Sequence, residues 1–112
     1  GNVGLGTTDP GSFALAVDGT IHTKEVLVDL NNWPDYVFEK EYPLLGLKEL
    51  RQYINTHGHL PNLPTAETVN KEGVVLGEMT RRMVEKTEEL TLYLLQQNER
   101  IKKLNLHNQL EK

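Results

Sequence analysis

The chain has 112 residues, of which 25% are charged, and its net charge is −4. It contains no cysteine, which excludes a disulfide framework, a thiol nucleophile and a thiolate metal site. The negative charge balance, with no basic block, argues against nucleic acid as a partner. No apolar run approaches the roughly 20 residues that a membrane-spanning helix needs, so we expect no membrane insertion.

Residues 1–30 are expected to form a β-rich segment. Phe13, Leu15 and Val17 alternate with alanines, which indicates a short strand, and Asp18-Gly19 is typical of a β-hairpin turn. A second strand is expected between this turn and residue 30. Strands this short need something to pack on, so we expect them to intertwine with copies of themselves.

Residues 31–75 are expected to form a small head, or connector. Aromatic residues between Pro34 and Pro43 predict an irregular segment around a small core, because proline disfavours helix in the residue before it. A helix is expected to begin after Gly46 and to end at His57, where Gly58 fits the left-handed closing position. Thr65 is expected to cap a short helix over 66–71 that Gly73 closes.

Residues 76–112 predict a long helix with a heptad repeat, whose seven positions are lettered a to g. Apolar residues recur at 3–4 spacing, and no proline interrupts them. A helix of this length, charged on most other faces, is expected to be a coiled coil. The predicted trimerisation residues at positions a and d are Leu76, Met83, Thr87, Leu90, Leu94, Gln97, Ile101, Leu104 and Asn108.

The heptad pattern favours three strands over two. Leucine and isoleucine at a and d permit either number, but Val84 at e and Tyr93 at g broaden the apolar face. The polar layers at Thr87, Gln97 and Asn108 are expected to fix the register. A parallel trimeric coiled coil is therefore predicted, with a dimer as the alternative. The expected fold class is α+β, made of short intertwined strands, a small helical head and the coil.

The sequence offers no catalytic constellation, so we expect no enzymatic activity and no cofactor. The single serine, Ser12, lies in a predicted turn without a suitable histidine base. Glu88 and Glu89 are expected to be solvated on the outer face of the coil. His57 and His59 are weak candidates for metal ligands, because a helix end explains this segment better; we therefore predict no metal site.

Two stretches resemble a known family. "NVGLGTTDPGSFALAVDGTI", residues 2–21, is similar to a segment found near the ends of phage tail fibres and related trimeric surface fibres. "WPDYVFEKEYPLLGLKELRQYINTHGHLPNLPTAETVNKEGVVLGEM", residues 33–79, resembles the C-terminal region of tail-fibre-like proteins common in Bacteroidota, and "EELTLYL", residues 88–94, recurs in their coiled coil.

The resemblance implies a homotrimeric fibre end on a bacteriophage virion, a phage-like device or a bacterial cell surface, hence an extracellular location. It strengthens the preference for three strands. Some fibre chaperone domains of this kind cleave themselves with a serine and a lysine. With only Ser12, far from any such motif, this chain is not expected to do so.

The leading functional hypothesis is therefore a structural module that trimerises a fibre and sets its register. A second hypothesis is a receptor-binding tip, in which Trp33, Tyr36 and Tyr42 contact a glycan or protein on a host or cell surface. The alternatives are a metal-pinned spike tip that uses His57 and His59, and a dimeric coiled-coil adaptor.

Overall fold

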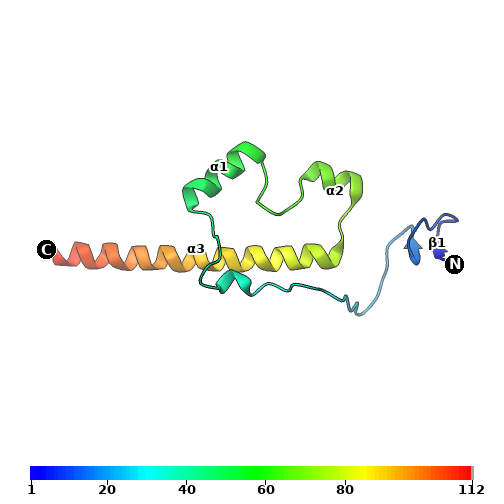
Figure 1. The fold of residues 1–112 in the computed structure, drawn as a ribbon, viewed down its shortest axis with the longest axis horizontal. Coiled ribbons are helices and arrows are strands. Elements are labelled where there is room, and N and C mark those ends of the chain that lie inside the picture. Colours follow the sequence, from blue (N-terminus) through cyan, green and yellow to red (C-terminus); the bar gives the residue numbers. More distant parts are fainter. Residues whose placement is uncertain (112) are drawn as a thin grey trace.

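The computed structural model describes residues 1–111, so Lys112 of the predicted coil lies outside the described residues. The molecule is elongated, with principal extents of 75 × 31 × 27 Å. One long helix, α3 (Leu76–Leu110), runs along most of this length, and the remaining elements are arranged beside it (Figure 1). A small sheet and several helices together make an α+β fold, as the sequence predicted.

The N-terminal segment holds two short strands, β1 (Val3–Leu5) and β2 (Leu15–Val17), which pair in parallel with Val3 opposite Leu15. The chain turns between them with the help of side-chain hydrogen bonds, such as that from the Gly11 amide to Asp9 (3.2 Å). The predicted hairpin at Asp18-Gly19 is wrong. After Asp18-Gly19 the chain continues into residues 20–33 without forming a strand, so β2 pairs with β1 and not with a following strand.

Residues 20–33 form an extended segment that leads from the sheet to α3 (Figure 1). Leu27 is 93% exposed, so the apolar residues here do not form the expected strand or a core of their own. The segment approaches α3 closely at Gly77. A Cβ atom at Gly77 would lie 2.7 Å from side-chain atoms of both Val28 and Leu30, so the absence of a side chain permits this approach.

We use the name connector only for the part of the head before α1 (Leu47–His57), residues 31–46. The connector packs against α3 through a 3₁₀ turn, η1 (Tyr36–Phe38). The fully buried side chains of residues 1–111 are those of Val37 and Pro34, both in this connector. A small core therefore exists, but the aromatic residues expected to form it do not all take part, since Trp33 is 51% and Phe38 is 54% exposed. The core lies between the connector and α3.

The two short helices agree closely with the sequence prediction. Helix α1 (Leu47–His57) begins after Gly46 and ends at Gly58, which has φ of 74° in the left-handed region. Helix α2 (Ala66–Glu72) begins at Thr65, whose hydroxyl accepts a hydrogen bond from the Thr68 amide (3.1 Å). Together α1 and α2 form an arm on the side of α3 away from η1 (Figure 1).

The long C-terminal helix is also confirmed. Helix α3 has 35 residues, which corresponds to about 52 Å at 1.5 Å per residue. Within residues 1–111, no helix is long and apolar enough to cross a membrane.

We predict that Gly58→Ala lowers the free energy of unfolding by about 1–2 kcal/mol, because a side chain disfavours the left-handed conformation. No atom lies within 4 Å of the added Cβ, so backbone strain accounts for the loss. Gly58→Asn is the control and should cost less, since asparagine tolerates this conformation. Urea unfolding at fixed protein concentration measures both. Equal stability of Gly58→Ala and wild type would contradict the assignment of Gly58 as the helix terminus.

Candidate functional site

The surface of α3 divides into two unlike faces. One face lies under the connector, where Gly77, Glu85 and Glu88 are buried. The opposite face bears the predicted positions a and d and remains exposed. The two faces therefore offer unlike surfaces.

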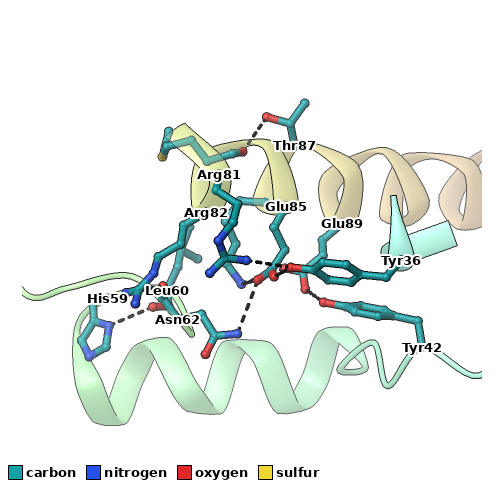
Figure 2. Close-up of polar contacts among 12 residues, drawn as sticks. Tyr36, Tyr42, His59, Leu60, Asn62, Arg81, Arg82, Glu85, Thr87 and Glu89 are labelled. Atoms are coloured by element: carbon teal, nitrogen blue, oxygen red, sulfur yellow. Dashed lines mark hydrogen bonds and ion pairs between the residues drawn. The ribbon is translucent and has the colours of Figure 1, made fainter. Parts of the chain in front are cut away.

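The connector is joined to α3 by tyrosine–glutamate pairs (Figure 2). The Tyr36 hydroxyl donates a hydrogen bond to Glu85, and the Tyr42 hydroxyl donates one to Glu89. The two tyrosine rings lie 6.0 Å apart between their centroids. The other Glu85 oxygen accepts a hydrogen bond from the Asn62 amide at 3.4 Å. Three segments distant in sequence therefore meet at Glu85.

Two arginines of α3 extend the same network (Figure 2). Arg81 donates to the Tyr36 hydroxyl at 3.2 Å, and Arg82 donates to the Asn62 carbonyl at 3.2 Å. Both arginines also pair with the Glu78 carboxylate. The polar contacts thus hold both the connector and the segment after α1 against α3.

The pKa values of the two carboxylates under the connector, Glu85 and Glu88, are shifted in opposite directions. Burial acts to raise the pKa of Glu85, but hydrogen bonds from Tyr36 and Asn62 and the charge of Lys86 outweigh it, so the pKa is below its usual value. Burial raises the pKa of Glu88, and the negative charge of Asp35 raises it further. Glu88 Oε1 is buried without a hydrogen-bond partner among the described residues.

The opposite face of α3 carries the predicted trimerisation residues. Thr87, at position a, points away from the tyrosine–glutamate cluster (Figure 2). The apolar members of this set remain half-exposed or more in the single chain, with exposed fractions of 51% for Met83 and 64% for Leu94. The others in this condition are Leu76, Leu90, Ile101 and Leu104.

This exposed face is also uncharged. Between Thr80 and Asn108, positions a, d and e carry only apolar, threonine, asparagine or glutamine side chains. Every charged residue of α3 falls at b, c, f or g: Glu78, Arg81, Arg82, Glu85, Lys86, Glu88, Glu89, Glu99, Arg100, Lys102 and Lys103. A second copy of the same face could therefore approach without charge repulsion along the seam. We call positions a, d and e from Thr80 to Asn108 the α3 seam.

The aromatic candidates for receptor contact differ from one another. Trp33 is 51% exposed. Tyr36 and Tyr42 are partly buried, and their hydroxyls are engaged by Glu85 and Glu89. The structure therefore leaves Trp33 as the accessible member of the set.

The histidine candidates lie at the end of α1. The His57 ring stacks on Tyr53 with centroids 4.1 Å apart, and the His57 and His59 ring centroids are separated by 6.0 Å. Each Nδ1 lies within hydrogen-bond distance of a backbone carbonyl, that of Tyr53 or Leu60. Among residues 1–111, no group of three histidine, aspartate or glutamate side chains comes together to hold a metal ion.

Sequence reasoning missed the role of the glutamates on the outer face of α3. The expectation that Glu88 is solvated is wrong, because the connector covers it and leaves it 9% exposed. Glu89 is partly buried and bonded to Tyr42 rather than free. Each tyrosine is separated from its glutamate by more than 45 residues, so no local spacing could have indicated the pairs.

Comparison of the chain with protein-family models, with curated proteins and with solved structures finds no match.

We predict that Tyr36 and Glu85 are energetically coupled. Tyr36→Phe should lower the free energy of unfolding by about 2 kcal/mol, because it removes a partly buried hydrogen bond to a charged group. A double-mutant cycle with Glu85→Ala, which removes the acceptor oxygens, isolates the pair from other effects. Strictly additive losses in the cycle would show that the contact contributes no stability.

We predict that Glu88→Gln stabilises the protein at pH 7. A raised pKa means that the folded state favours the protonated form of Glu88. The contribution of protonated Glu88 to folding stability is therefore fully present below the pKa of the unfolded state, and it is lost as the pH rises through the pKa of the folded state. The variant and wild type should therefore have similar melting temperatures at pH 4, and the variant should melt higher at pH 7. Thermal unfolding across this range measures the difference.

Glu41→Gln provides the control, since Glu41 is an exposed carboxylate of the same connector. It should not reproduce the pH-dependent gain. A lower melting temperature for Glu88→Gln at pH 7 would mean that charged Glu88 stabilises the fold.

Proposed function

We propose that this chain is a structural module that trimerises the end of a tail-fibre-like or surface-fibre protein and sets its register. The observation that carries the proposal is the division of α3. The connector is packed on one face of the helix, while the apolar, uncharged seam on the other face has no partner within residues 1–111. Packing three copies of the seam together would cover these residues without displacing the connector.

The energetic reason for assembly is the exposed apolar surface. Complete burial of a leucine or isoleucine contributes about 1.5–3 kcal/mol relative to full exposure. Leu94, Ile101 and Leu104 are each more than half exposed in the single chain, so most of this contribution is available only through association. A 35-residue helix presents several such layers, whose contributions accumulate along the coil.

Register would follow from the polar layers of the seam. Thr87, Gln97 and Asn108 interrupt the apolar positions at unequal distances along the helix. A shift of one heptad would place some of them opposite leucine or isoleucine, which leaves a buried polar group without a partner. The parallel, in-register arrangement then brings three connectors and three N-terminal segments to the same level, at an effective concentration of about millimolar.

Three strands are favoured over two by the flanks of the seam. Val84 at e and Tyr93 at g extend the apolar surface beyond a and d. A wider apolar surface per helix suits a trimer, in which each helix contacts two neighbours. The resemblance of residues 2–21 and 33–79 to trimeric fibre ends supports the same number and an extracellular setting on a virion, phage-like device or cell surface.

A receptor contact is a second candidate function, and Trp33 is the residue that favours it. Its indole remains 51% exposed although it lies next to the buried Pro34. Exposed tryptophan is enriched at binding surfaces because it offers a large, rigid contact area. On this proposal, three copies of Trp33 surround the coil and present repeated contacts to a glycan or protein.

The experiment that tests trimerisation compares two adjacent leucines. Leu94 lies in the seam at a, and Leu95 lies outside it at b, yet their exposed fractions are similar at 64% and 56%. We predict that Leu94→Glu prevents assembly, because each chain loses about 2 kcal/mol of burial and three carboxylates meet in one layer. Leu95→Glu should leave assembly intact.

Light scattering coupled to gel filtration, across a dilution series, gives the mass of each form. Wild type and Leu95→Glu should show three times the chain mass of 12.7 kDa, and Leu94→Glu should show a smaller species. A wild-type dimer would support the adaptor instead. A wild-type monomer, or equal behaviour of the two variants, would contradict a coiled coil at this seam.

A further inference from the structure

A groove lies between the arm and α3. Its volume is about 620 Å³, and its walls are largely apolar. The arm contributes Leu50, Leu60 and Pro61, and α3 contributes Met83 and Leu90 among others. Met83 and Leu90 are also d positions of the α3 seam. The groove is therefore continuous with the surface proposed to bind other copies of the chain.

The arm is held to α3 at two places and leaves the groove between them. At one end, the Tyr93 hydroxyl donates a hydrogen bond to the Leu45 carbonyl at 2.6 Å, just before α1 begins. At the other end, Arg82 and Glu85 bind Asn62 through its carbonyl and its side-chain amide. Figure 2 shows α1 running alongside α3, with the Asn62 contact between them.

Helix α1 itself is only partly covered by its own chain. None of its residues is buried, although Leu47, Leu50, Tyr53 and Ile54 form an apolar face. Leu47 is 44% exposed and Ile54 is 41% exposed. An amphipathic helix of 11 residues is marginal in water without tertiary packing, so this face requires a partner.

We propose that the groove is filled by α3 of a neighbouring copy, so that the arm of each chain clasps the next chain in the coil. This inference rests on the proposed assembly and adds its geometry. The arm stands beside positions c and g of its own α3, marked by Arg82, Lys86 and Tyr93. In a parallel coil, the g side of one helix faces the e side of its neighbour. The occupant is therefore the neighbour's flank at Val84 and Thr91.

The charge pattern of α3 selects a second copy as occupant. Positions e carry valine, threonine and asparagine between Val84 and Asn105, so the incoming flank brings no charge into an apolar groove. The groove's cation, Lys86, is already paired with Glu89 at 2.9 Å and therefore does not require an anionic partner. A charged peptide or a phosphate-bearing ligand would find no unpaired cation there among the described residues.

The test uses two single-cysteine variants, because the natural chain contains no cysteine. Leu50→Cys places a thiol on the arm, and Thr91→Cys places one on an exposed e position of α3. The two variants are unfolded together, refolded as a mixture and oxidised, with a parallel sample treated with a short bismaleimide. A disulfide forms only when the two Cα atoms lie within about 7 Å. A mixed pair can arise only between chains.

We expect a covalent pair of chains, on a non-reducing gel, that is abundant in the mixture and absent or weak in either variant alone. The matched control mixes Leu50→Cys with Lys102→Cys, which lies on α3 beyond the arm and should give no pair.

If neither reagent joins Leu50→Cys to Thr91→Cys while light scattering shows trimers, the clasp is wrong and the trimer stands. If the mass is that of a dimer and the pair forms, the clasp stands and the trimer is wrong. A monomer without the pair overturns both.

Discussion

The contact between the connector and α3 is the constraint on which the rest of the structure depends. Gly77 lets the extended segment lie directly against the helix, and Val37 fills the space beneath η1. Tyrosine–glutamate pairs then fix the connector along the next turns of α3. Because this contact occupies the outer face, the seam positions of the same helix remain outside the chain's own core. The position of the connector thus determines which face of α3 stays exposed.

The small size of this core leaves much of the apolar surface of the single chain exposed. Burial of apolar area is the main favourable contribution to folding, and small domains bury a smaller fraction of their surface than large ones. Among residues 1–111, complete burial of apolar side chains is restricted to the connector, while α1, the seam and the segment before Gly77 keep much of their apolar area exposed. An assembly that joins seam to seam and arm to neighbour would cover the first two of these surfaces together.

The two buried glutamates differ in how well the surrounding residues satisfy them. Glu85 is well satisfied by its neighbours, whereas Glu88 has a buried oxygen with no partner among residues 1–111. A buried carboxylate that lacks partners costs free energy, so its presence opposes tight packing at this site. The hydrogen bonds to Glu85 and Glu89 nevertheless define one position for each tyrosine. They locate the connector at a single height on a helix whose apolar surface alone would permit sliding.

Local sequence determined the helices of this protein. Gly46, Gly58 and Thr65 mark helix ends through backbone geometry and capping, which act within a few residues. The heptad repeat of α3 has a period that belongs to one helix surface.

Tertiary structure alone decided the rest. The parallel pairing of β1 with β2, in place of the predicted hairpin, depends on a loop that brings residue 15 beside residue 3. The tyrosines that bond Glu85 and Glu89 come from the connector, 49 and 47 residues away, and no periodicity links them. Contacts of that range depend on how the chain folds back on itself, whereas caps and heptads depend only on the residues beside them.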